Sequence, residues 1–113
     1  MKYPMNERGK ARKELSLLSA GLIQADKKII LVLAQRASFV RRILLWKMRY
    51  GQPIIRKNVE KQRIARILRL ARPFGHDPGF IRALYYLVIA ESCRIQLELK
   101  ESGEFPKEHR MIF

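Results

Sequence analysis

The stretch from Glu14 to Tyr50 contains no proline and a single glycine, Gly21, and this continuity limits what the chain can fold into. Within it, apolar residues recur at intervals of three, four and seven, as on one face of an α-helix. The residues of this stripe are Leu15, Leu18, Leu22, Ala25, Ile29, Leu33, Val40 and Ile43. We therefore predict one long helix. The alternative is a break at Gly21, since glycine costs about 1 kcal/mol inside a helix.

The length of this helix predicts how the chain assembles. At a rise of about 1.5 Å per residue it is roughly 55 Å long. A compact chain of 113 residues has a diameter of only about 30 to 35 Å. One end must then project beyond its own core, and its apolar stripe needs a cover. A second copy of the chain is the simplest cover, so we expect a two-fold homodimer.

Two further helices are predicted from capping residues and prolines. Gly51 and Pro53 favour an end to the long helix near residues 50–51. Asn58 is a candidate N-cap for a second helix, which should run to about Arg72. Asp77 followed directly by proline predicts the start of a third helix, covering residues 78–102. Because no strand pattern appears, the fold class is all-α: three helices of very unequal length.

The two ends of the chain carry less information. Residues 1–13 are rich in lysine and arginine, and we expect a loose basic arm that becomes helical near Arg12. Gly103 should end the third helix, and residues 104–113 form a tail with an apolar end. We interpret residues 1–113 as one helical domain, which includes the basic arm and the tail.

Charge and cysteine content narrow the partners and the cellular setting. The chain has 24 Lys and Arg against 10 Asp and Glu, a formal net charge of +14, which favours anionic partners. Its one cysteine, Cys93, rules out an internal disulfide and a multi-cysteine metal site. A reducing, cytoplasmic setting fits. No secretory h-region and no apolar run near the ~18 residues of a membrane span are visible.

Five polar residues fall on stripes that should face the core. They come from all three predicted helices: Arg36, Lys47, Glu60, Ser92 and Gln96. Any one of them alone is usually a satisfied core polar group or a long side chain that reaches solvent. Together they are better explained as the lining of one pocket. Arg36 and Lys47 are about 16 Å apart along the helix axis, which leaves room for a small organic anion.

The same residues carry a resemblance to the all-helical class of chorismate mutases. It covers about residues 14–99, and the matching segments are "LIQADKKIILVLAQR", "WKMRYGQPI", "EKQRIARILRLA" and "GHDPGFIRALYYLVIAESCRIQ". The resemblance implies an intertwined homodimer of three-helix protomers, with a long first helix that crosses both subunits. It also implies a reaction within one molecule, the rearrangement of chorismate to prephenate, which requires no metal and no cofactor. The related isochorismate pyruvate lyases share this fold.

The resemblance also implies a role for each matching residue. Arg36 would grip a carboxylate of the substrate, while Lys47 and Gln96 would donate hydrogen bonds to the breaking ether oxygen. Glu60 would position the ring hydroxyl, and Ser92 would help to line the pocket. Histidines 76 and 109 have no partner at metal-ligand spacing, so no metal site is expected.

This chain departs from the family pattern at three positions. Ser19 stands where the family has an arginine that reaches into the partner's pocket. Arg56 stands in place of an acid, and Val59 in place of an arginine. Two cations of a dianion site are thus absent, each worth about 1.5 to 3 kcal/mol as a charge-assisted hydrogen bond. Arg56, one turn before Val59, restores one charge in our interpretation.

Two classes of function follow. The first is an enzyme: a chorismate mutase of reduced efficiency in aromatic amino-acid biosynthesis, or alternatively a lyase of the related kind. The second is a catalytically weak or inactive protein of the same fold that binds a small anion or nucleic acid in a regulatory role. The outer face of the second helix, which we predict to carry Lys61, Arg63, Arg66 and Arg69, would suit nucleic acid. The interleaved aromatic residues of a single-strand binder are missing, so nucleic acid is the less favoured partner.

Overall fold

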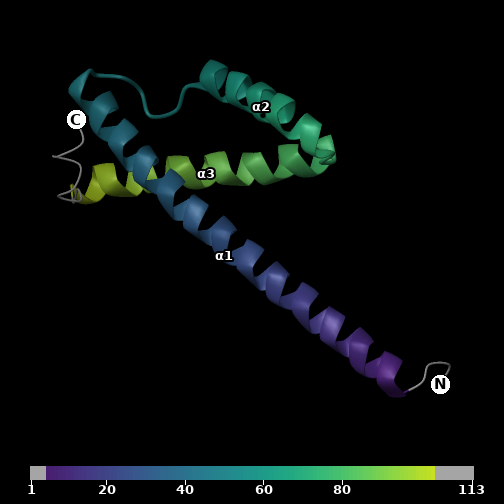
Figure 1. Ribbon diagram of the computed structural model, residues 1–113. Coiled ribbons are helices and arrows are strands. Elements are labelled where there is room, and N and C mark those ends of the chain that lie inside the picture. Colours follow the sequence, from purple (N-terminus) through teal and green to yellow (C-terminus); the bar gives the residue numbers. More distant parts are fainter. Residues whose placement is uncertain (1–4, 104–113) are drawn as a thin grey trace. The chain divides into compact units, whose positions relative to one another are not determined.

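The computed structural model describes residues 5–103, and three α-helices with one short 3-10 helix make up most of that range (Figure 1). Helix α1 spans Met5–Arg49, α2 spans Lys57–Ala71 and α3 spans Pro78–Ser102, while a short 3-10 helix, η1, covers Arg72–Phe74. No strand occurs in the described residues. The predictions of an all-α class and of a very long first helix are confirmed.

Helix α1 begins earlier than the sequence pattern suggested. Residues 5–13 belong to the helix, so the prediction of a loose arm up to Arg12 is wrong for them. No proline occurs among these residues, and Glu7 lies in the first turn, where the helix dipole favours an acid. The helix also continues through Gly21, so the alternative break is not observed. The tail at 104–113, with its apolar end and His109, lies outside the described residues.

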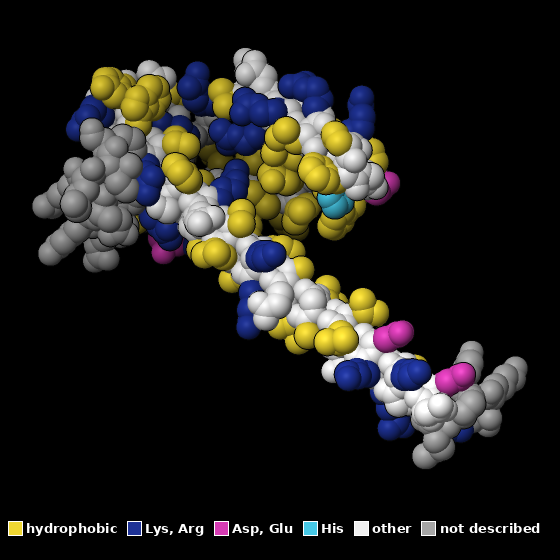
Figure 2. All heavy atoms as spheres, in the orientation of Figure 1, with side chains coloured by type: hydrophobic (Ala, Val, Ile, Leu, Met, Phe, Trp, Pro, Cys, Tyr) yellow, Lys and Arg dark blue, Asp and Glu magenta, His cyan; other side chains and the backbone are white. Residues whose placement is uncertain are grey.

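The chain divides between Arg36 and Ala37 into two compact units. The first unit consists of the α1 residues up to Arg36, and the predicted apolar stripe is exposed along it. Leu18 is 72% exposed and Leu22 is 64% exposed, although both are large and apolar. From residue 29 to 33, five consecutive apolar side chains are exposed, so the helix is apolar on every side there. Figure 2 shows hydrophobic side chains along this segment, in yellow.

The second unit contains the end of α1 together with α2, η1 and α3. Its core consists of Val40, Leu44, Ile81 and Ile89, with Leu44 fully buried. Helices α2 and α3 lie side by side (Figure 1), and the α2 face predicted to point inward (Ile64, Ile67, Leu68 and Ala71) is half-buried. Ser92 and Gln96 are the buried polar residues of this unit among those described, as their places on the predicted stripe require.

The ends of α3 follow the sequence signals. The Asp77 side chain accepts a hydrogen bond from Phe80 N at 2.9 Å, which caps the helix. At the other end, Gly103 takes a left-handed conformation, with φ of 68°, and donates to Leu99 O. Both predicted caps are therefore confirmed.

The start of α2 differs from the prediction. The helix begins at Lys57 with Arg56 as its N-cap in an extended conformation and without a side-chain cap hydrogen bond, so Asn58 lies inside the first turn. The backbone N–H of Glu60 donates to Arg56 O, which completes a turn that begins before Asn58. Because of this earlier start, Arg56 lies at the N-terminal end of α2.

Candidate active site

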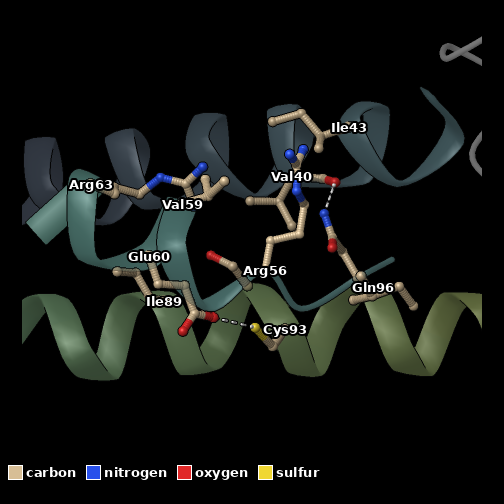
Figure 3. Close-up of a pocket in the computed structure, with 11 residues that line it drawn as sticks. Val40, Ile43, Arg56, Val59, Glu60, Arg63, Ile89, Cys93 and Gln96 are labelled. Atoms are coloured by element: carbon tan, nitrogen blue, oxygen red, sulfur yellow. Dashed lines mark hydrogen bonds between the residues drawn. The ribbon is translucent and has the colours of Figure 1, made fainter. Parts of the chain in front are cut away.

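The second unit contains a pocket built from α1, α2, α3 and the connection between α1 and α2 (Figure 3). Its cavity volume is about 50 Å³, and the space around it is partly open to solvent. The residues that line it are Val40, Ile43, Ile54, Arg56, Val59, Glu60, Arg63, Ile89, Ser92, Cys93 and Gln96.

Gln96 connects the pocket to Lys47. The Lys47 Nζ atom donates to Gln96 Oε1 at 3.1 Å and to the backbone oxygen of Ile54 at 2.6 Å. Gln96 is only 4% exposed, and its Nε2 atom donates to Val40 O at 2.9 Å. These contacts fix the orientation of the amide, with its oxygen toward the lysine.

A count of donors shows what Lys47 and Gln96 can still offer a ligand. An ammonium group has three N–H donors and a side-chain amide has two. The described contacts use two donors of Lys47 and one of Gln96. These contacts leave one N–H of each residue for a further acceptor.

The ammonium of Lys47 lies in an environment that disfavours its charge. Burial lowers its pKa from the ordinary value of 10.5, and the positive charges of Arg63 and Arg56 lower it further. Cys93 and Glu60 act in the opposite direction without reversing the shift. An anion in the pocket would stabilise the charged form that these cations disfavour.

Glu60 and Cys93 pair across the pocket from α2 and α3. The Cys93 thiol donates to Glu60 Oε1 with an S···O distance of 3.7 Å (Figure 3). Burial raises the pKa of Cys93, and both the charge of Glu60 and this hydrogen bond raise it further. The thiol therefore stays protonated and acts as a donor, which orients the carboxylate of Glu60.

Ser92 lies on the wall of the pocket formed by α3. It is buried, 7% exposed, and its hydroxyl donates to Val88 O at 2.9 Å, one turn earlier in the same helix.

The wall of the pocket formed by α2 carries two arginines, one predicted and one not. Arg56 lines the pocket at the start of the helix, as predicted, and Val59 lies one turn later with a short apolar side chain. Arg63 lines the pocket as well and is half-buried, so its prediction as an outward-facing cation is wrong. It follows Val59 by four residues, and this spacing places both on one side of α2. Lys61, Arg66 and Arg69 are exposed, as predicted.

Two predicted site residues belong to the first unit. Arg36 is half-buried on α1, one helical turn before Val40, and Ser19 is exposed on the same helix. Their roles toward a substrate stay predictions. The structure thus brings together Lys47, Arg56, Glu60, Ser92 and Gln96 from the predicted set.

Sequence reasoning missed Arg63 and Cys93 as pocket residues. Both lie at the border of the predicted inner face. Arg63 comes three residues after Glu60, and Cys93 directly follows Ser92, so each borders a position already assigned to the inner face.

Within residues 5–103, no group of three or more His, Cys, Asp and Glu side chains could hold a metal ion. No helix in that range is long and apolar enough to cross a membrane. His76 is exposed in the turn before α3, near the ring of Phe74.

This all-helical fold, with a polar pocket between its helices, is that of the chorismate mutases. The family model described as chorismate mutase type II matches residues 19–97. The chain therefore belongs to the chorismate mutase type II family. No solved structure matches it significantly.

One similar protein is named 4-amino-4-deoxychorismate mutase and comes from Streptomyces pristinaespiralis. The two sequences are 33% identical over 92 residues, which is 81% of this chain and 71% of that protein. The aligned segment therefore covers most of the chain.

Proposed function

We propose that this protein catalyses the rearrangement of chorismate to prephenate in the cytoplasm, as a step in aromatic amino-acid biosynthesis. The observation that carries the proposal is the polar set around one pocket: Lys47 hydrogen-bonded to Gln96, with Glu60 and Ser92 on the facing walls. These residues come from three helices of a chain that belongs to the chorismate mutase type II family.

The reaction needs binding and electrostatic stabilisation rather than a nucleophile. Chorismate must be held in a compact chair while negative charge builds on the breaking ether oxygen. The remaining N–H groups of Lys47 and Gln96 would donate to that oxygen. Glu60, oriented by the Cys93 thiol, would accept a hydrogen bond from the ring hydroxyl. Arg36 would bind one carboxylate of the substrate.

We further propose that the active form is a homodimer. The support is the exposed apolar surface of the first unit, where large side chains such as Leu18, Leu22 and Ile29 are more than half exposed. Apolar surface of this extent is unusual on a monomer and typical of a protein interface. In the dimer, Ser19 of one protomer would lie at the mouth of the other protomer's pocket.

The absence of an arginine at Ser19 and Val59 supports reduced efficiency. Each missing charge-assisted hydrogen bond is worth about 1.5 to 3 kcal/mol, or roughly tenfold to a hundredfold in rate.

A second candidate substrate is the 4-amino analogue of chorismate. The similar protein from Streptomyces pristinaespiralis is named for a mutase of 4-amino-4-deoxychorismate. The carboxylate of Glu60 would suit an ammonium group at the ring position as well as a hydroxyl, because an ammonium donates charge-assisted hydrogen bonds.

In the test, purified protein is incubated separately with chorismate, 4-amino-4-deoxychorismate and isochorismate, and the products are separated by chromatography. Prephenate from chorismate is the expected result. The amino analogue of prephenate would assign the second substrate, and salicylate with pyruvate would assign the lyase reaction. If none is consumed while a bicyclic mimic of the transition state still binds, the protein is a binding or regulatory member of the family. Salt-sensitive binding of duplex DNA with no binding of that mimic would favour the nucleic-acid alternative.

A further inference from the structure

Arg63 lies in the pocket, and none of the roles assigned so far accounts for an arginine there. It is half-buried on α2 and lines the same cavity as Glu60 and Gln96. On the exposed side of a basic helix an arginine would remain in solvent, as Arg66 does. Arg63 instead gives up part of its hydration, and this costs free energy unless an anion compensates for it.

The pocket holds more positive than negative charge. Arg56, Arg63 and the neighbouring Lys47 are cations, and Glu60 is the acid among the lining residues. In Figure 3, Glu60 turns toward Cys93, while the guanidinium groups of Arg56 and Arg63 lie away from its carboxylate. Among residues 5–103, Arg94 forms ion pairs with Glu91 and Glu98, whereas neither Arg56 nor Arg63 is paired with a described acid.

The electrostatics of Lys47 agree with this placement. Arg63 acts on Lys47 as a positive charge and lowers its pKa, ahead of the smaller effect of Arg56. The two cations therefore influence each other within the site, and a bound anion between them would relieve their repulsion.

The space beside Arg63 suits a carboxylate. Val59, one turn earlier on the same face of α2, has a short side chain and leaves the adjacent volume open. One helical turn is about 5.4 Å, so the long side chain of Arg63 can reach back over Val59. Side chains on a helix point toward its N-terminus, and here that is the direction of Arg56.

We propose that Arg63 binds one carboxylate of the substrate dianion, in place of the cation that is absent at Val59. The assignment rests on the proposed function and adds to it a substrate-binding residue outside the family pattern. A guanidinium group there can hold the carboxylate through two parallel hydrogen bonds.

The experiment measures binding by titration calorimetry. The probes are a bicyclic dicarboxylate that mimics the transition state and its two monomethyl esters, each of which lacks one of the negative charges. The variants are Arg63→Gln and Arg63→Lys. Arg66→Gln is the control, because it removes the same charge from an exposed position on the same helix. Circular dichroism checks that each variant is folded, and Arg63→Lys provides a second measurement that keeps the positive charge.

Arg63→Gln is expected to weaken binding of the dicarboxylate roughly tenfold to a hundredfold, as for loss of a charge-assisted hydrogen bond. Arg63→Lys should lose less, and Arg66→Gln should change affinity by less than about twofold. The informative result is the ester pattern: one monoester, and not the other, should bind to Arg63→Gln and to the unmutated protein with similar affinity.

Equal losses for both monoesters would mean that Arg63 contacts neither carboxylate, and the assignment would be overturned. Unchanged affinity of Arg63→Gln for the dicarboxylate would overturn it too, while leaving the proposed function intact. If the unmutated protein does not bind the dicarboxylate, the proposed function fails first and the role of Arg63 with it.

Discussion

Gln96 accepts a hydrogen bond from Lys47 and holds this lysine at the edge of the pocket, although the two residues lie on different helices and far apart in the sequence. The same amide donates to the backbone of Val40. Its oxygen and nitrogen therefore have separate tasks, and the amide cannot flip without losing both contacts.

Replacing Gln96 should affect both stability and catalysis. In Gln96→Ala, Lys47 loses an acceptor in a half-buried environment, and we expect a loss of about 1 to 3 kcal/mol in the free energy of unfolding. Loss of one donor to the charge developing on the ether oxygen should lower kcat/KM by roughly a hundredfold. Urea denaturation and steady-state kinetics measure the two effects. Gln62→Ala, at an exposed position of α2, is the matched control and should change neither.

The pH dependence of the reaction should report Lys47. Its pKa is lowered by burial and by Arg63 and Arg56, so the free protein loses the proton below the ordinary lysine value of 10.5. Because only the charged form donates hydrogen bonds from all three N–H groups, kcat/KM should fall as the pH rises through this lowered pKa. A bound anion favours the charged form, so the fall in kcat should occur at higher pH. Lys47→Arg should show no such alkaline limb, and a limb that persists in this variant would exclude the lysine as its origin.

The thiol of Cys93 should react slowly with alkylating reagents. Its pKa is raised by burial and by Glu60, so at pH 8 less of it is thiolate than in an ordinary cysteine. Because it is the one cysteine of the chain, the incorporation of iodoacetamide, followed by mass spectrometry, reports this site alone. Glu60→Gln removes the neighbouring charge and should speed the reaction. A rate in the native protein equal to that of the urea-unfolded chain would contradict the pairing.

The apolar surface of α1 predicts a dimer that one charge should disrupt. Light scattering should give the unmutated protein about twice the 13.3 kDa mass of the chain. Leu22→Lys places an ammonium where a large apolar side chain is 64% exposed in the single chain. If a partner covers that position, the variant should become monomeric or unfold, since a buried unpaired charge is costly. Lys27→Glu, at an exposed charged position of the same helix, should leave the mass unchanged.

Ser19→Arg should improve the proposed mutase. In the proposed dimer, Ser19 would lie at the mouth of the other protomer's pocket, where the family pattern has an arginine. A serine hydroxyl is too short to grip a carboxylate as an arginine does. We expect kcat/KM for chorismate to rise by about tenfold or more, with little change in stability, because arginine is the better helix former. An unchanged rate would mean that another cation already completes the pocket. Val59→Arg added to Ser19→Arg should raise kcat/KM by a smaller factor, because Arg56 and Arg63 already supply positive charge beside Val59.

The fold was largely predictable because its signals are local. The caps at Asp77 and Gly103 depend on neighbouring residues, and the continuity of α1 depends on the absence of proline. The start of α2 was not predictable in this way. Asn58 is a better capping residue than Arg56 by intrinsic preference, and the backbone of the connection decided the outcome.

The site was predictable where periodicity was unambiguous. Ser92 and Gln96 lie in the middle of an apolar stripe and are buried. Arg63 lies at the border between the two faces of α2, where a rotation of a few tens of degrees decides whether a long side chain faces the pocket or solvent. Periodicity cannot resolve that difference. The charge of an arginine favours the prediction that it faces solvent, which is wrong for Arg63.

The hydrogen bond from Lys47 to Ile54 O has a consequence for mutagenesis. Ile54 lies in the connection between α1 and α2, two residues before Arg56, so the lysine anchors the segment that brings an arginine to the pocket. Truncating this lysine removes a hydrogen-bond donor from the pocket and also removes the contact that anchors the connection between α1 and α2. A fall in rate for Lys47→Ala would combine both losses. Combining Lys47→Ala with a proline at a compatible position in residues 50–56 would separate the two losses, because the proline would stiffen the loop without restoring the donor.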